Sequence, residues 1–291
     1  MNITNKYLYL LIALLLCSCQ QNNSQEKKEQ VPKVQDKKED QKPAIINLNA
    51  NATVDRIGTP KSYNRTPQDP LSFQHYLRNL PLKPFGEPVL YYNGNAKPNA
   101  KIYHSVINLD IGDKDLHQCA DSIMRLRAEY LWNQKKYEEI HFNFTNGFRV
   151  DYNQWAKGKR MIIEGNKTYW DDGDKPSNEY QDFWNYLELI FTYSGTASLE
   201  KEMKPKELAD ANIGDVLIQG GHPGHAVIII DEAIDQAGKK VYLLAQSYMP
   251  AQDIQILHNP MNPNLSPWYA LEEGKIETPE WIFTDQDLKS F

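Results

Sequence analysis

The chain has few cysteines, no excess of positive charge and no visible internal repeat. Only three of its 291 residues are cysteine, at positions 17, 19 and 119. Acidic residues outnumber basic ones by 38 to 32, so the net charge is −6. Neither nucleic acid nor an anionic membrane surface is therefore a favoured partner. The N-terminal apolar run from Leu8 to Leu16 is too short to span a bilayer.

The N-terminus is typical of a processed leader. Lys6 precedes the apolar run, which ends in Leu16-Cys17-Ser18-Cys19. These four residues resemble a bacterial lipoprotein lipobox. The resemblance implies that residues 1–18 are a signal peptide and that Cys19 is acylated after cleavage, with palmitate among the usual chains. Gln20, directly after the acylated cysteine, then favours sorting to the outer membrane, with the domain on its periplasmic face. The lipid anchor is the only contact with the membrane that we expect. An ordinary secretory signal, which would leave Cys19 as a stray thiol, is the alternative.

The next segment has too little apolar surface to fold. Residues 20–53 are dominated by Gln, Lys, Glu, Asp and Pro, so burial cannot offset the entropy of ordering them. We predict that residues 19–53 are a lipid anchor and disordered tether. Residues 54–291 are long enough for one α+β domain with a sizeable core.

The most informative stretch runs from Gly214 to Pro250. It predicts a short strand over 215–219, a Gly/Pro-rich turn, and a hairpin with strands over 225–231 and 240–246. Because the first hairpin strand is almost continuously apolar, it is expected to be buried on both faces. If the hairpin is centred on Asp235 and Gln236, His225 lies directly opposite Gln246.

Helices and strands alternate in mixed order elsewhere, which predicts an α+β fold with a largely antiparallel sheet. One long, largely buried helix is expected to start at Asp113 or Asp115 and to reach Tyr137. The other expected elements are a helix from Asp69 to Leu80, strands over 88–93, 101–111 and 140–144, a helical turn over 153–157, an acidic loop over 170–177, and a helix capped by Ser177 that ends at Tyr193.

Four residues of the chain suit nucleophilic catalysis. After processing, Cys119 is the only free thiol, and it lies within the first two turns of its predicted helix. The helix N-terminus favours the thiolate. His225 is a candidate general base and Gln246 a candidate orienting group for it. Gln118 and the backbone N–H of Cys119 are candidates for an oxyanion hole.

The same residues carry a resemblance. Gln118-Cys119 at a helix start, the GDV…PGHAVIIID run and a polar residue ending the next strand resemble the papain-like cysteine peptidases. The most similar branch is that of the cysteine- and histidine-dependent amidohydrolases/peptidases and the NlpC/P60 domains. The resemblance implies an antiparallel sheet packed on a Cys-bearing helix, and cleavage of an amide bond in peptidoglycan or a peptide by Cys119, His225 and Gln246. The chain from about Gly58 onward is also similar to an uncharacterised family of bacterial lipoproteins.

Other interpretations stay open. Cys119 alone suits a core position, and the whole domain can be a non-catalytic binding or structural lipoprotein that retains the fold. His222 and His225 form an HxxH pair that could bind zinc, although no further Cys/His cluster lies nearby in the sequence. Asp171, Asp172 and Asp174 are more typical of a solvated turn than of a calcium site or glycosidase carboxylates. We therefore expect no metal and no cofactor, and the sequence does not indicate an oligomeric state.

The lipobox interpretation predicts the effect of replacing Cys19. A Cys19→Ser variant should lose its membrane anchor, because the processed chain keeps no apolar segment able to hold it. Cell fractionation, with mass spectrometry of the mature N-terminus, measures this. Retention of Cys19→Ser in the membrane fraction after signal cleavage would contradict the interpretation.

Overall fold

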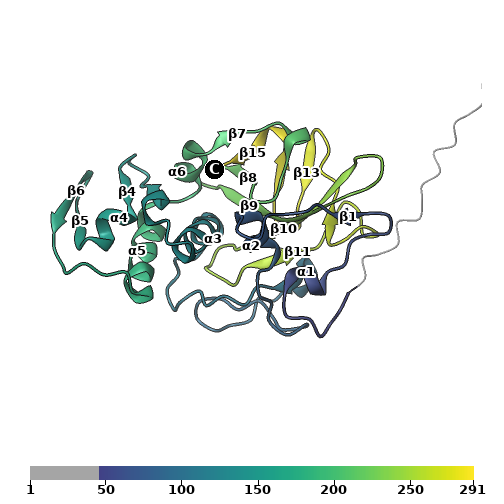
Figure 1. Ribbon diagram of the computed structural model, residues 1–291, viewed down its shortest axis with the longest axis horizontal. Helices are drawn as coiled ribbons and strands as arrows, with labels where there is room; N and C mark the ends of the chain where they lie inside the picture. Colours follow the sequence, from purple (N-terminus) through teal and green to yellow (C-terminus); the bar gives the residue numbers. More distant parts are fainter. Residues whose placement is uncertain (1–45) are drawn as a thin grey trace, which may run out of the picture. The chain divides into compact units, whose positions relative to one another are not determined.

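The computed structural model describes residues 46–291, shown in colour in Figure 1. The predicted signal peptide, the predicted lipidation at Cys19 and nearly all of the predicted tether fall in residues 1–45 and lie outside the described part. Within residues 46–291, no helix is both long and apolar enough to cross a bilayer.

The fold is mixed α and β, and every strand pairing in the described residues is antiparallel, as predicted. The helices are α1 (Thr53–Arg56), α2 (Phe73–Arg78), α3 (Cys119–Asn133), α4 (Tyr152–Ala156), α5 (Tyr180–Tyr193) and α6 (Thr196–Glu202). Short 3₁₀ turns lie at Ala100–Ile102 (η1), Tyr137–Glu139 (η2), Leu208–Asp210 (η3) and Asp285–Asp287 (η4).

The largest sheet has the strand order β2-β11-β10-β9-β8-β15-β7, with β1 paired to β9 and β12 paired to β10. These strands are β1 (Asn64–Arg65), β2 (Tyr103–Val106), β7 (Lys204–Pro205), β8 (Val216–Gln219), β9 (His225–Ile234), β10 (Lys240–Gln246), β11 (Gln255–Leu257), β12 (Trp268–Tyr269) and β15 (Leu288–Ser290). Three separate hairpins are formed by β3 (His141–Asn143) with β4 (Arg149–Asp151), β5 (Lys159–Glu164) with β6 (Lys167–Asp172), and β13 (Lys275–Glu277) with β14 (Ile282–Thr284).

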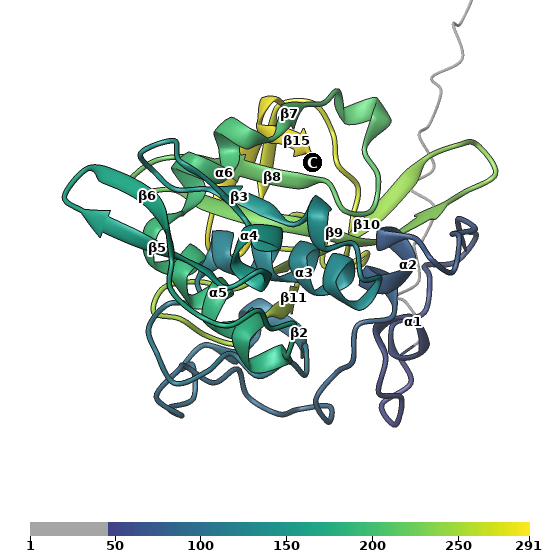
Figure 2. The same ribbon diagram turned by 60° about the vertical axis from the view of Figure 1, so that its left-hand side comes forward.

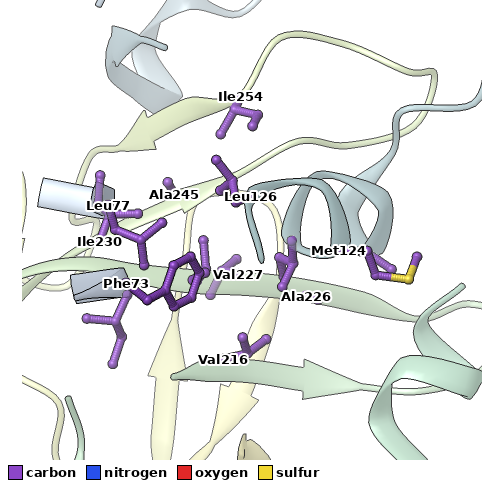
Figure 3. Packing of buried hydrophobic residues seen from close by; sticks show 14 of the residues in the cluster. Phe73, Leu77, Met124, Leu126, Val216, Ala226, Val227, Ile230, Ala245 and Ile254 are labelled. Atoms are coloured by element: carbon purple, nitrogen blue, oxygen red, sulfur yellow. The ribbon is translucent and has the colours of Figure 1, made fainter. Parts of the chain in front are cut away.

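Helix α3 is the central helix of the core. It packs against β9 and β10 of the large sheet and also contacts α2, α5 and α6 (Figure 2). Figure 3 shows Ala226 of β9 facing α3, and Ile230 of β9 beside Phe73 and Leu77 of α2. All but the last residue of β9 are buried, as its apolar sequence predicts.

Several predicted boundaries were wrong for local reasons. The long helix begins at Cys119 rather than at Asp113 or Asp115, because the Asp121 carboxylate accepts the backbone N–H of Gln118 at 3.0 Å and caps the helix there. Helix α2 begins after Ser72, whose side chain accepts the backbone N–H of His75. Only Tyr103–Val106 of the predicted strand over 101–111 is a strand, and the region 88–93 makes isolated bridges. Ser177 does not cap α5, which begins after Glu179.

A buried ion triad joins β9 to the N-terminal part of the domain. Asp231 accepts from Arg65 at 2.7 Å and from Arg78 at 2.5 Å, and its side chain is fully buried. Arg78 also donates to the backbone oxygens of Thr66 and Glu232. Because a buried carboxylate must keep its partners, these contacts hold β9 and α2 together.

We expect Arg78→Ala to destabilise the domain by about 3 kcal/mol, because it leaves the Asp231 carboxylate short of one buried cation. Chemical denaturation measures the change in the free energy of unfolding. Lys136→Ala, which removes an exposed pair with Glu139, is the control and should cost no more than about 1 kcal/mol. Equal losses in both variants would show that the triad carries no special stability.

Candidate functional site

Cys119 is the first residue of α3 and is almost fully buried. Burial, and to a smaller extent the nearby Asp121 carboxyl, raise the pKa of its thiol to about 11, although the backbone N–H groups of Ala120, Ala226 and Cys119 itself act to lower it. The prediction that the helix N-terminus would favour a thiolate was therefore wrong. Desolvation outweighs the helix terminus, and Cys119 rests as a neutral thiol at neutral pH.

His225 is the first residue of β9 and is 1% exposed. Its Nε2 lies 2.8 Å from Oε1 of Gln246, the last residue of β10. Burial lowers the pKa of His225 to about 4, and the positive charge of Lys97 also lowers it, while the bond to Gln246 raises it. The imidazole is therefore neutral at neutral pH, as a general base must be.

The pairing of His225 with Gln246 depends on a β-bulge. The predicted hairpin centre was wrong, because Ile234 pairs with Lys240 and the turn lies between them. The register then shifts by one residue between Leu243 and Leu244. In the shifted register Ala245 lies opposite Ile228, so the next residue, Gln246, falls opposite Val227. Gln246 is therefore diagonal to His225 and on the same face of the sheet. Without the shift, the two side chains would point to opposite faces.

Aromatic rings enclose the imidazole. The ring of Tyr248 lies 4.8 Å from that of His225, the ring of Trp281 5.4 Å, and the ring of Phe283 5.9 Å. The indole N–H of Trp281 donates to Gln219 Oε1 at 2.8 Å, which fixes the position of the indole. These rings exclude water from the His225–Gln246 bond and account for the low pKa of His225.

Behind Gln246 lie two charged residues that the sequence analysis missed. The Gln246 side-chain Nε2 donates to Glu280 Oε2 at 2.6 Å, and Lys97 Nζ donates to the same oxygen at 2.8 Å. Lys97 also donates to Gln252 Oε1 at 2.9 Å. Glu280 lies in the turn between β13 and β14, and Lys97 follows the isolated bridge at Leu90 and Ala96. No local motif marks either residue, because the contacts join segments that lie far apart in the sequence.

Cys119 reaches the same end of β9 as His225. The backbone N–H of Ala226, the residue after His225, lies close enough to lower the pKa of the thiol. Cys119 also contributes to the raised pKa of Tyr248, whose ring contacts His225. Among the hydrogen bonds of residues 46–291, none joins the Cys119 sulfur directly to the imidazole. Catalytic hydrogen bonds are commonly longer in unliganded sites and tighten when substrate binds.

A cleft of about 470 Å³ opens beside Cys119. Its walls include Cys119, Thr196, Gly221, Gly224 and Met249. A Cβ atom at Gly224 would lie 2.4 Å from Thr196 Oγ1 and 2.7 Å from the Gly221 oxygen. The glycine before His225 is therefore required for this turn to pack against the wall of the cleft.

Gln118 also lines this cleft, at the N-cap of α3. Its side-chain Nε2 donates to Asp115 Oδ1 at 3.2 Å. The same Asp115 oxygen accepts the backbone N–H of Ala251 at 2.6 Å. The Gln118 amide therefore lies at the mouth of the cleft, but it must exchange the bond to Asp115 for one to a ligand before it can act in an oxyanion hole.

The metal interpretations gain no support from the geometry. The described residues contain no group of three or more His, Cys, Asp or Glu side chains that could hold a metal ion. His225 is bonded to Gln246, and His222 lines the cleft. The predicted acidic loop over 170–177 begins inside β6, which runs to Asp172. There Asp172 pairs with Lys159 at 3.6 Å, and beyond the strand Asp174 pairs with Arg160 at 3.3 Å.

Together, the fold and the site define a mixed α and β protein in which a cysteine at a helix start and a buried His–Gln pair meet at one end of an antiparallel sheet. The chain belongs to the family described as domain of unknown function 4846, whose profile matches residues 53–290. No curated protein matches the chain, and no solved structure does.

The raised thiol pKa predicts slow, pH-dependent alkylation of Cys119. In a Cys17→Ser/Cys19→Ser background, the rate with iodoacetamide should rise about tenfold per pH unit from pH 7 and level off only near pH 11, since only the thiolate reacts. In denaturant, the profile should level off near the ordinary cysteine pKa of about 8.5. A plateau below pH 8 in the folded protein would contradict the neutral thiol.

Proposed function

We propose that this protein is a lipid-anchored cysteine amidohydrolase or peptidase of the cell envelope, with a papain-like (NlpC/P60-like) domain that cleaves an amide bond in peptidoglycan or a peptide. The observation that carries the proposal is the 2.8 Å bond from His225 Nε2 to Gln246 at the end of β9, where the next backbone N–H reaches Cys119. A nucleophile, a base and an orienting group are the parts that cysteine acyl transfer needs.

The charge states of the site favour general-base catalysis over a preformed thiolate. With a thiol pKa near 11 and an imidazole pKa near 4, both groups are neutral at rest. As Cys119 Sγ attacks the carbonyl carbon, the thiol proton passes to His225 Nδ1. The tetrahedral intermediate then expels the amine, which takes that proton, and leaves a thioester on Cys119. Water, deprotonated by His225, hydrolyses the thioester and regenerates the thiol.

The negative oxygen of the intermediate needs donors near the start of α3. The first backbone N–H groups of a helix have no partner within the helix, and that of Cys119 is among them. Gln118 supplies a second donor once its amide leaves Asp115. These two donors form the proposed oxyanion hole.

The packing of α3 supports the papain-like arrangement. The helix bears the cysteine at its N-terminus and lies against β9 and β10, which carry the base and the orienting residue. Acylation of Cys19 would attach this domain to the periplasmic face of the outer membrane. The proposed chemistry requires no metal and no cofactor.

A non-catalytic binding lipoprotein is the second candidate, and two observations favour it. The Cys119 thiol has a raised pKa, and it makes no direct bond to His225 among the described residues. In that case the cleft beside Cys119 would bind a peptide or glycopeptide without cleaving it.

Substitution of the three residues separates the two candidates. Cys119→Ala and His225→Ala should each abolish hydrolysis of purified muropeptides or peptides, and Gln246→Ala should reduce it about tenfold to a hundredfold. Mass spectrometry of the released fragments measures the reaction. His141→Ala is the matched histidine control and should keep full activity, because His141 lies on β3 and does not line the cleft.

Thermal unfolding accompanies these assays, because the variants must stay folded for the comparison to hold. Cys119→Ala should cost on the order of 1 kcal/mol of stability. Turnover that persists in folded Cys119→Ala would rule out the nucleophile. Binding without turnover in the wild type, unchanged in Cys119→Ala, would favour the binding lipoprotein.

A further inference from the structure

The amide of Gln246 lies between two groups that fix its orientation. On one side its Nε2 lies 2.6 Å from Glu280 Oε2, and Lys97 Nζ donates to that oxygen at 2.8 Å. A carboxylate oxygen that receives an ammonium proton acts as an acceptor. The NH₂ end of the Gln246 amide must therefore face Glu280.

This orientation decides which nitrogen of His225 carries the proton. With its NH₂ end on Glu280, Gln246 presents Oε1 to His225 Nε2 at 2.8 Å. An amide oxygen can only accept, so Nε2 must be the protonated nitrogen. A neutral imidazole carries one ring proton, which leaves the lone pair on Nδ1.

We propose that Glu280, held by Lys97, is a positioning residue that selects the Nε2–H tautomer of His225 through Gln246. Gln246 alone cannot make this selection, because its two amide ends have nearly the same shape. If the amide turned over, NH₂ would donate to Nε2 and the proton would move to Nδ1. The nitrogen that takes the thiol proton in the proposed function would then be blocked.

The surroundings support a positioning role for the carboxylate. The turn that carries Glu280 is closed by the Thr278 backbone N–H, which donates to the Trp281 oxygen at 2.8 Å. The Lys97 side chain is 6% exposed and is also bound to Gln252 Oε1. The carboxylate is therefore anchored from two directions, whereas a solvated surface acid would not be.

The catalytic consequence rests on the proposed function, but the tautomer does not. The direct test is ¹⁵N NMR of histidine-labelled protein, in which the two ring nitrogens of each tautomer have distinct shifts. The His225 signals are assigned by their loss in His225→Ala. The wild type should show a protonated Nε2 and an unprotonated Nδ1.

Glu280→Met removes the acceptor at similar length and should bring the Nδ1–H tautomer to a third or more of the population. Glu280→Gln keeps an oxygen that both Gln246 and Lys97 can reach, and should retain Nε2–H. The matched control is Glu277→Met, because Glu277 pairs with Lys275 in the same hairpin and should behave as the wild type. In the Gln246→Glu/Glu280→Met double variant, a carboxylate that can only accept faces Nε2, so Nε2–H should return.

If Glu280→Met does not fold, Glu280→Leu replaces it, because leucine also removes the acceptor and should move the signals in the same direction. A wild-type tautomer in folded Glu280→Met, or in Glu280→Leu where that variant replaces it, overturns the proposal. Where turnover is measurable, Glu280→Met should lower kcat about tenfold with little change in KM. If the tautomer shifts but the wild-type protein shows no turnover, the positioning role is supported and the proposed enzymatic function is contradicted. Failure of the positioning role and failure of the proposed function therefore give different results.

Discussion

The site depends on the burial of two polar side chains at the open end of a largely apolar hairpin. His225 and Gln246 are 1% and 0% exposed, so each must find its hydrogen-bond partner within the protein. The one-residue shift in the pairing of β9 and β10 gives them a common face. Burial also lowers the pKa of the imidazole and, at Cys119, raises that of the thiol, so exclusion of water sets the charge states of both groups.

The charged groups nearest to His225 and Gln246 are an ion pair, Glu280 and Lys97, on the far side of the Gln246 amide. Burial raises the pKa of Asp121, near Cys119, to about 8, so this carboxyl is mostly neutral at neutral pH. The neutral amide of Gln246 separates the ion pair from the imidazole. In the proposed mechanism, both reacting groups stay uncharged until a substrate carbonyl is present, and the thiol proton then passes to His225.

The sequence predicted the parts of the site that follow from local pattern. The limits of β10 were predicted correctly because an apolar run ends there in a polar residue, and the His225–Gln246 contact was predicted although the hairpin centre was wrong. The observed pairing differs from the predicted one by two residues, once the true turn position and the bulge are both counted. A shift of two residues keeps His225 and Gln246 on the same face of the sheet, so the contact still forms. The start of α3 was missed because a side chain, Asp121, caps it. Glu280 and Lys97 were missed because only the tertiary fold brings them to Gln246.

The measurement that tests the proposed enzyme most directly is detection of a covalent intermediate on Cys119. The protein is mixed with muropeptides, quenched in acid within the first turnover, and digested for mass spectrometry. The proposal predicts that the peptide containing Cys119 gains the mass of the acyl fragment as a thioester. Amide-bond cleavage with no adduct on Cys119 at any quench time, and undiminished cleavage by folded Cys119→Ala, would contradict it.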